Sequence, residues 1–380
     1  MNRCLVTKLN GSVDNTSLLR IGEMRIGISK IDSPNHWTQG FRITVNKLTV
    51  LEIIGDGYFT DVNLTANNGK KITLNPNVSE KVYVSNGNFE VAILDKYALV
   101  SLFDYDEYSE GNSTYSQKNK SISDIGAFKY STAMTSLGIS NANISGDIAN
   151  LKNLTALTRI ELIGTNISGD IANLKNLTAL TILKLSNTHV SGDIANLKNL
   201  TALTNMQLSN THVSGDIANL KNLTALTNLV LSNTHVSGDI ANLKNLTALT
   251  NLVLSNTQIP LTGEISALST LSKCSTISLS FSKLTGDLAI LPDACCEVYL
   301  YYNKGSVFTW STRPSSAYII SLGGASLYSN VDKMLQDQAQ CQVGTTANKT
   351  ISATGTRTSA SDNAVATLQQ KGYTVIINPA

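Results

Sequence analysis

Hydrophobic residues in the middle of the chain recur with a period of 23 residues, and their spacing changes within each unit. The unit that begins at Ser191 has apolar side chains at Ile194, Leu197, Leu200, Leu203, Met206, Leu208 and Val213. A spacing of three gives way to one alternation of two, and a continuous helix cannot satisfy both. The pattern predicts a short strand centred on Met206, then a turn and an irregular or 3₁₀ return segment.

The copies are marked by Ser-Gly-Asp-Ile, which begins at Ser145, Ser168, Ser191, Ser214 and Ser237. Degenerate copies begin at Thr262, after an insertion of Pro260 and Leu261, and at Thr285, and an earlier copy surrounds Asp124. We therefore place a repeat array at residues 121–303, whose stacked units bury one another's apolar faces. The predicted strands form one parallel sheet and are centred near Leu137, Ile160, Leu183, Met206, Leu229, Leu252, Ile277 and Val298.

The unit reads Leu-x-x-Leu-x-x-Leu-x-Leu-x-x-Thr-x-Val-x-Gly-x-Ile, which resembles the leucine-rich repeat, and its Ser-Gly-Asp-Ile is similar to the Gly-x-Ile-Pro of the plant-type subclass. The resemblance covers about half of the chain and implies a solenoid with a parallel sheet, but no particular ligand. One departure is threonine where the family usually has asparagine, although asparagine returns at Asn303. We expect the threonine hydroxyl to bond the buried turn; the residues are Thr165, Thr188, Thr211, Thr234 and Thr257.

The segments on either side of the array have different patterns. Residues 1–120 contain short β-branched and aromatic runs between Gly, Asn and Pro, which predicts an all-β anchoring or assembly domain of sandwich or barrel type, with a loop or linker at 104–122. Residues 304–380 alternate strand and helix patterns, with expected helix caps at or near Ser329 and Ser361. Such an alternation favours parallel crossovers that continue the repeats as an α/β cap.

Composition excludes several kinds of partner. The chain has 380 residues, of which 15% are charged, and a net charge of +2. That balance favours neither nucleic acid nor an anionic membrane. No apolar run approaches the length of a membrane helix, and the first residues lack the apolar segment of a signal peptide. We therefore expect no membrane insertion and no export by the signal-peptide route.

Three polar columns recur with the repeat. One is histidine, at His189, His212 and His235; the others are Asp147, Asp170, Asp193, Asp216 and Asp239, and Lys152, Lys175, Lys198, Lys221 and Lys244. A histidine row on one face does not close a tetrahedral metal site, and solvent exposure explains it more simply. An aspartate row could bind calcium, but an aspartate after glycine at a tight turn is explained by local turn bonding. We expect neither a metal nor a cofactor.

The five cysteines show no Cys-x-x-Cys spacing, which disfavours a zinc site or a disulfide framework. Cys274 and Cys295 each precede a predicted strand by three residues, where regular units have a core leucine. We expect both to be small buried hydrophobic residues with free thiols, although a bridge between neighbouring units lies within disulfide range.

The repeats keep their interior constant and vary at the positions that project from the predicted strands. A constant framework with a varied outward strip is what a binding surface needs, although unrestrained drift of exposed positions would look the same. The same alternation predicts that further residues project: Ile163, Ser186, Ser209, Ser232, Ser255, Thr276, Ser278, Ser280 and Glu297. The candidate binding residues are Arg159, Glu161, Ile182, Lys184, Asn205, Gln207, Asn228, Val230, Asn251, Val253, Tyr299 and Tyr301.

The sequence shows no catalytic triad, paired carboxylates or phosphate loop in a supporting context, so we expect a non-enzymatic protein. The first hypothesis is a phage virion attachment protein that forms a homo-oligomer. In it, residues 1–120 contact other virion proteins and the repeats bind a host glycan or protein. Both termini are similar to those of proteins from Bacteroides phages and their hosts. The alternative is a cellular leucine-rich-repeat adhesin or interaction module, and a glycan-cleaving enzyme would need catalytic carboxylates in the N-terminal domain.

Overall fold

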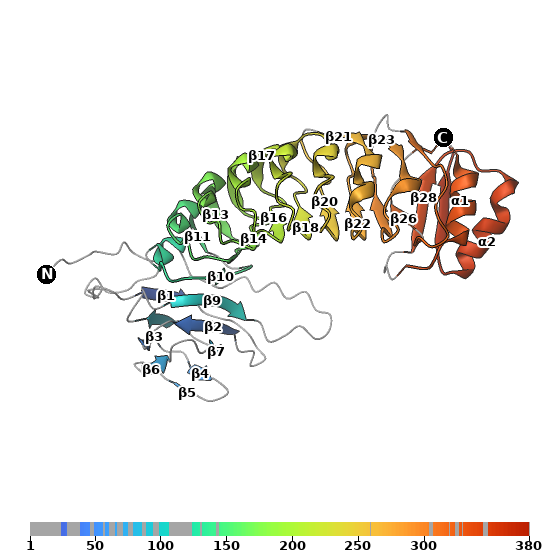
Figure 1. Ribbon diagram of the computed structural model, residues 1–380. Coiled ribbons are helices and arrows are strands. Elements are labelled where there is room, and N and C mark those ends of the chain that lie inside the picture. The colour runs from blue at the N-terminus through green and yellow to red at the C-terminus, as the bar shows by residue number, and fades with distance from the viewer. Residues whose placement is uncertain are drawn as a thin grey trace. The chain divides into compact units, whose positions relative to one another are not determined.

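Figure 1 shows the computed structural model of the protein. The structure describes strands between residues 24 and 105 and then residues 124–379, with gaps at 130, 142–143, 259, 304–306, 319, 324–326, 329 and 345–348. The chain divides into two parts, Met1–Val190 and Ser191–Ala380, and each part is described by itself.

The N-terminal region contains nine strands with antiparallel pairing among them. One sheet has the order β1-β8-β3-β6, while β2 lies between β7 and β9, and β4 pairs with β5 and β7. The connections and all side chains of this region, including most of the expected linker at 104–122, lie outside the described residues, so a sandwich or barrel domain stays a prediction. The strands are β1 (Met24–Ile28), β2 (Gln39–Val45), β3 (Thr49–Gly55), β4 (Tyr58–Thr60), β5 (Thr65–Ala66), β6 (Lys71–Leu74), β7 (Ser79–Ser85), β8 (Phe89–Ile93) and β9 (Leu99–Tyr105).

The repeats of the first part form parallel strands in register. Ile160 at the centre of its strand lies opposite Leu137 on one side and Leu183 on the other. The first repeat strand, β10, also pairs in parallel with β9. The elements are η2 (Ile125–Phe128), β10 (Ser136–Gly138), β11 (Ser145–Asp147), η3 (Ile148–Leu151), β12 (Arg159–Glu161), β13 (Asn166–Asp170), η4 (Ile171–Leu174) and β14 (Ile182–Lys184).

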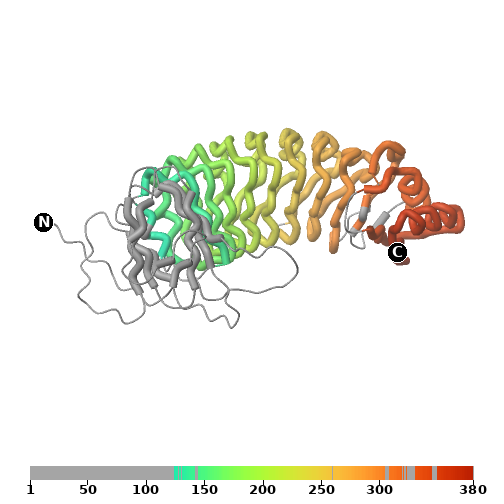
Figure 2. The backbone as a smooth tube through the Cα atoms, turned by 90° about the horizontal axis from the view of Figure 1, so that it is seen from below, coloured from blue at the N-terminus to red at the C-terminus, as the bar shows by residue number. Residues whose placement is uncertain are grey.

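The second part continues the same unit, and its coils follow one another from yellow-green to orange in Figure 2. Strands β16, β18, β20, β22 and β24 pair in parallel, each with the next. The elements are β15 (His189–Asp193), η5 (Ile194–Leu197), β16 (Asn205–Gln207), β17 (His212–Asp216), η6 (Ile217–Leu220), β18 (Asn228–Val230), β19 (His235–Ser237), η7 (Ile240–Leu243), β20 (Asn251–Val253), β21 (Thr262–Glu264), η8 (Ile265–Thr270), β22 (Thr276–Ser278), β23 (Lys283–Asp287), η9 (Leu288–Ile290), β24 (Glu297–Tyr299) and β25 (Val307–Thr309).

The prediction of one parallel sheet is wrong, because each unit contributes a second short strand. The segment after the turn, interpreted from the sequence as irregular, is extended and pairs in parallel with its neighbours, as in β17 with β19 and β21 with β23. Its alternation places Thr211 and Val213 inward and leaves His212 exposed, which suits an extended strand. The 3₁₀ segment that follows it is confirmed in every regular unit, from η3 to η7.

The interior of a regular unit consists of aliphatic side chains and a few specific polar bonds. In the unit around β18, Leu223, Leu226, Leu229, Leu231 and Val236 have no exposed surface. The threonine prediction is confirmed for four of the five residues, because each hydroxyl donates to the carbonyl three residues earlier, at 2.6 to 2.7 Å; these are Thr165, Thr188, Thr211 and Thr234. The hydroxyl therefore closes its own turn. Asn303, in contrast, reaches the neighbouring unit, where its Oδ1 accepts from the backbone N–H of Ser282 at 2.8 Å.

Aspartate begins each 3₁₀ segment of the regular units. Asp216 accepts a hydrogen bond from the backbone N–H of Ala218 at 2.7 Å, and Asn219 donates to the Asp216 carbonyl at 3.0 Å. The same bonds recur in the neighbouring units, as at Asp193 and Asp239. The local turn bonding expected for the aspartate column is thus confirmed.

Beyond the repeats, the parallel pairing continues through β24, β26, β28 and β29. Two helices lie between these strands, and the orange-red end of Figure 1 shows them side by side. Asn330 caps the first helix by accepting from the Lys333 N–H, whereas the expected Ser329 lies outside the described residues. Ser361 precedes the second helix, but its hydroxyl donates to Asp332 at 2.6 Å instead. The elements are β26 (Ser321–Gly323), β27 (Leu327–Tyr328), α1 (Val331–Gln340), β28 (Thr350–Thr354), η10 (Ser359–Ser361), α2 (Asp362–Gln370) and β29 (Thr374–Asn378).

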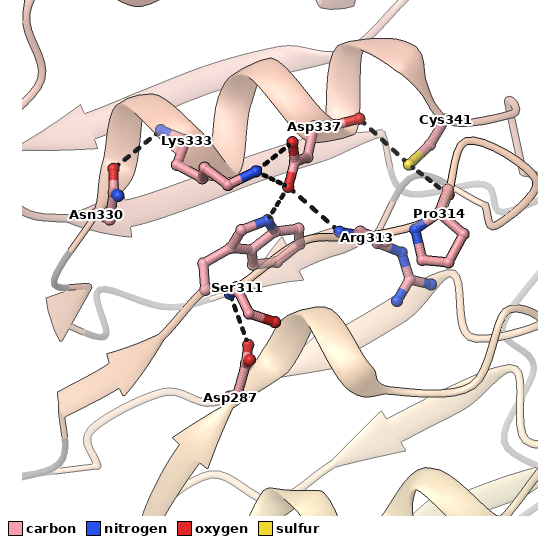
Figure 3. Close-up of polar contacts among 9 residues, drawn as sticks. Asp287, Ser311, Arg313, Pro314, Asn330, Lys333, Asp337 and Cys341 are labelled. Atoms are coloured by element: carbon pink, nitrogen blue, oxygen red, sulfur yellow. Dashed lines mark hydrogen bonds and ion pairs between the residues drawn. The ribbon is translucent and has the colours of Figure 1, made fainter.

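A buried polar cluster joins α1 to the end of the repeats (Figure 3). Asp337 accepts from the Trp310 indole N–H at 3.1 Å and from the Arg313 backbone N–H at 3.2 Å, and it pairs with Lys333 at 2.9 Å. The Arg313 guanidinium donates to five backbone carbonyls; they belong to Ala289, Leu291, Pro292, Cys295 and Tyr318. Arg313 thus supplies buried donors to carbonyls in and just after η9 (Leu288–Ile290).

Candidate binding surface of the repeats

The strands of the first sheet expose the candidate residues in a regular way. Each three-residue strand buries its central side chain and leaves its two flanking side chains half-buried, from β12 to β24. This alternation follows from the pleat of an extended chain. The candidate residues listed from the sequence all occupy these flanking positions, except Tyr301, which follows its strand and is exposed.

The first part presents a charged group. Glu161 pairs with Arg159 at 2.6 Å and with Lys184, from the next strand, also at 2.6 Å. Burial disfavours ionisation of Glu161, but the hydrogen bonds from Lys184 and Arg159 outweigh it, so the pKa of this carboxyl is lowered. The three side chains form a fixed ion-pair group, with Ile182 half-buried beside it on β14.

The second part presents amides instead of charges. The Asn228 amide donates to Asn205 Oδ1 at 3.2 Å, and the Asn251 amide donates to Asn228 Oδ1 at 2.8 Å. Gln207 adds a donor to the same Asn205 oxygen at 3.1 Å. Side-chain amides linked from strand to strand hold each other in one orientation, which gives the surface a fixed pattern of donors and acceptors. Val230 and Val253 lie half-buried at the other flank of their strands.

Three serines of the column next to the strands do not project as predicted, whereas Ser232 and Ser255 of the same column are half-buried. Ser186, Ser209 and Ser280 are buried, with 8%, 9% and 5% of their surface exposed. Within the second part their hydroxyls bond the next unit: Ser209 accepts from the Ser232 N–H at 3.1 Å, and Ser280 accepts from the Tyr301 N–H at 2.9 Å. A small hydroxyl side chain that reaches a backbone donor gains more by turning inward than by projecting into water.

The next column is asparagine in a left-handed backbone conformation. Asn210, Asn233 and Asn256 have φ of 55° to 56°, and their amides form a ladder in which each donates to the preceding Oδ1 at 2.6 Å. In the last two units this position is taken by Phe281 and Tyr302, with φ of 62° and 55°. Bulky side chains rarely adopt this conformation, whereas asparagine tolerates it.

These two aromatic residues were missed by the sequence reasoning, although Tyr299 and Tyr301 were not. Phe281 and Tyr302 stack with ring centroids 4.9 Å apart, and Tyr299 and Tyr301 stack at 6.3 Å with an interplanar angle of 12°. Exposure reaches 68% for Tyr302 and 42% for both Phe281 and Tyr301, so each of these side chains is in part open to solvent. Aligning the last two units with the asparagine column would have revealed the substitution.

The other polar columns do not form a site in the described part of the chain. His212 and His235 lie with ring centroids 6.1 Å apart and a tilt of 43°. Within residues 124–379, apart from the gaps given above, no group of three or more His, Cys, Asp or Glu side chains is placed to hold a metal ion. The same described residues include no helix long and apolar enough to cross a membrane.

The cysteines of the second part are buried and unbridged. Cys274 and Cys295 have no exposed surface, which confirms their prediction as small core residues, and Cys296 and Cys341 are also buried free thiols. Burial raises the pKa of the Cys274 thiol to about 12 and also raises that of Cys295. Cys4 lies outside the described residues.

No protein-family model matches the sequence, and no curated protein is similar to it. Solved structures do match. The leucine-rich-repeat ectodomain of the Arabidopsis receptor kinase HAESA, in complex with an extended IDA peptide hormone ligand, is 20% identical, with a TM-score of 0.53 over 68% of this chain and 44% of that one. The plant peptide hormone receptor RGFR1 in complex with RGF2 is 21% identical, with a TM-score of 0.51 over 67% of this chain and 41% of that one.

These similarities identify the fold. The chain has the leucine-rich-repeat fold, as its parallel strands and 3₁₀ segments independently indicate, and it spans less than half the length of the two receptor chains. That fold is typical of receptor and interaction proteins. The similarity of the termini to phage proteins has no counterpart in these two receptor structures.

Proposed function

We propose that this chain is a non-enzymatic binding protein whose repeats present the flanking residues of the first-sheet strands to a partner. One observation carries the proposal. The buried positions stay aliphatic from unit to unit, while the half-buried flanking positions change from an ion-pair group at Glu161 to linked amides at Asn228 and to tyrosine at Tyr299. A rigid framework that carries a changing outward strip suits recognition.

The proposed surface has two chemical characters, one in each part. The Arg159, Glu161 and Lys184 group offers fixed charges of both signs, which suit a polar partner that can pair with them. The amides of Asn205 and Asn228 offer neutral donors and acceptors on a preorganised backbone. Partners of this surface are a protein or a glycan.

For the biological setting, we propose that the chain is part of a phage particle and forms a homo-oligomer there. Residues 1–120 would attach the chain to other virion proteins, and the repeats would bind the host surface. The support is the sequence: a polar, nearly neutral composition and the similarity of the termini to Bacteroides phage proteins. A leucine-rich-repeat adhesin at a bacterial surface, or a cellular interaction module, is the alternative.

A site-specific photo-crosslinker tests the binding surface. Benzoylphenylalanine would replace Gln207 or Val230, which flank first-sheet strands, and Lys221, an exposed residue after a 3₁₀ segment, as the matched control. We expect a discrete adduct from the first two positions and none from the third, in irradiated particles or cells that contain the chain. Equal adducts at all three positions, or none at Gln207 and Val230, would refute the proposal.

The setting has its own test. Phage particles purified through a density gradient should contain the chain at a fixed ratio to the major capsid protein. If the chain occurs only in or on uninfected bacteria, the virion proposal fails and the cellular alternative takes its place, whatever the crosslinking shows.

A further inference from the structure

Four aromatic side chains at the end of the repeats form an exposed cluster, which we call the aromatic platform: Phe281, Tyr299, Tyr301 and Tyr302. Two stacked pairs compose it, one across neighbouring units and one within β24 and the residues after it. The rings of Phe281, Tyr301 and Tyr302 are exposed by 42% to 68%, although large aromatic surfaces are normally buried.

The platform occupies positions that the other units fill with small polar residues. Phe281 and Tyr302 replace the asparagine of the left-handed column, and Tyr301 replaces the serine of the inward column. Each substitution is unfavourable for the fold, because it puts a bulky ring on a backbone with φ of 62° or 55°, or removes a hydroxyl that would bond the next unit. Strain that the fold does not require points to a function of the residues that cause it.

The neighbouring strands place a small residue on each side of Tyr299. On one side, Tyr299 is paired across the sheet with Gly323 of β26. On the other flank, the residue paired with Tyr299 is Ser278, whose hydroxyl lies 2.7 Å from that of Ser255. The platform is therefore bordered by glycine and hydroxyl groups.

The polar groups beside the rings suit a ligand with many hydroxyls. Thr276 donates to Glu297 Oε2 at 3.3 Å at the start of the same two strands, and Glu297 and Tyr299 flank the buried centre of β24. A flat aromatic face offers apolar contact to the C–H face of a sugar ring, while a carboxylate and hydroxyls around it bond the sugar's hydroxyl groups. A protein ligand would be better matched by aliphatic side chains around the rings, whereas the two residues paired with Tyr299 are a serine and a glycine.

We infer that the aromatic platform binds carbohydrate, with pyranose rings stacked on Tyr299, Tyr301 and Tyr302. The inference rests on the proposed function of the repeats as a binding surface, and it names the class of ligand and the end of the array where binding is anchored. A neutral polysaccharide is the expected class, since Glu297 is the one charged residue of strands β22 and β24, which carry the platform.

The test is affinity gel electrophoresis of the full chain in gels that contain laminarin, glucomannan, xylan, dextran or glycogen. The variant combines Phe281→Asn, Tyr301→Ser and Tyr302→Asn, each of which restores the residue of the regular units. Because asparagine tolerates the left-handed backbone, the variant should unfold at the same temperature as the wild type or higher. The control is Tyr318→Ser, which removes a tyrosine that is 36% exposed outside the platform.

We expect at least one of the polysaccharides to retard the wild type and the control, and the triple variant to bind it at least tenfold more weakly. Retardation by none of the five, or equal retardation of a folded triple variant, would overturn the inference. A protein adduct from Gln207 or Val230 without polysaccharide binding would leave the proposed function standing and overturn the carbohydrate assignment alone. If the wild type binds a polysaccharide and the triple variant does not, but no adduct forms at Gln207 or Val230, the carbohydrate assignment stands and the proposed function of the first-sheet strands fails.

Discussion

Replacing Gly238 with alanine should destabilise the repeats more than an ordinary glycine substitution. Gly238 has φ of +124°, and an added Cβ would lie 2.3 Å from Asp216 Oδ1 of the preceding unit and 3.0 Å from Ile217 Cγ1. That aspartate oxygen already accepts the Ala218 N–H at 2.7 Å to begin a 3₁₀ segment. Alanine would therefore strain its own backbone and displace a cap in the neighbouring unit.

The expected cost can be worked from these two effects. A side chain in a sparsely populated backbone region costs about 1 to 3 kcal/mol. Loss of an aspartate cap costs about 0.5 to 2 kcal/mol. Together they predict that Gly238→Ala lowers the free energy of unfolding by roughly 1.5 to 5 kcal/mol. Typical proteins have about 5 to 15 kcal/mol in total.

Urea unfolding followed by circular dichroism measures the change, with Gly372→Ala as the matched control. Gly372 also has positive φ, +84°, but the nearest atom to its added Cβ is Lys349 Cδ at 3.8 Å, at the movable end of a side chain. The control should lose only the backbone cost, about 1 to 3 kcal/mol. If Gly238→Ala loses no more than Gly372→Ala, the close contact with Asp216 does not matter and the reasoning is wrong.

Three further predictions follow from single contacts. Thr234→Val should cost about 1 to 3 kcal/mol because it leaves the buried Leu231 carbonyl without its donor, whereas Thr227→Val, at an exposed hydroxyl, should cost less than about 0.5 kcal/mol in the same urea assay. Cys274, whose thiol has a pKa raised to about 12 by burial, should resist alkylation at pH 8 until the chain unfolds, as peptide mass spectrometry would show; rapid labelling of the folded chain would contradict this. Hydrogen bonds from Ser361 and Thr358 lower the pKa of Asp332, so its contribution to stability is present above the unfolded-state pKa near about 4 and is lost as pH falls through the folded value. The difference in melting temperature between wild type and Asp332→Asn should therefore narrow below about pH 4; a difference that stays constant to pH 2 would refute it.

The repeats were predictable from the sequence because the structure of each unit depends on residues that lie close together in the chain. The spacing of three around Leu200 and Leu203 predicts the return segment, and Ser-Gly-Asp-Ile predicts the turn that Asp216 caps. Copies of one unit repeat this evidence, and the core positions of Cys274 and Cys295 follow from alignment alone. The second line of strands was missed because the segment around Val213 is too short for an alternation to stand out.

The candidate surface was predicted in part. The alternation along each strand placed Asn205 and Asn228 at flanking positions, where the structure has them. It placed Ser209 there too, and the structure buries that hydroxyl against the next unit. The sequence shows which side chains alternate to the outer face of a strand. Whether a small polar side chain there turns inward depends on a backbone donor that only the neighbouring unit supplies.

By itself, then, the sequence determined the period, the buried aliphatic positions, the capped 3₁₀ segments and the leucine-rich-repeat resemblance, because all of these depend on residues close together in the chain. Only the tertiary structure decided three contacts. Glu161 pairs with charges from two strands, the Arg313 guanidinium donates to carbonyls at the end of the array, and the rings of Phe281 and Tyr302, whose backbones are left-handed, stack on each other. The Glu161–Lys184 pair, the bond from Arg313 to the Leu291 carbonyl and the Phe281–Tyr302 stack each join residues of neighbouring units, so their geometry exists only after the units have packed.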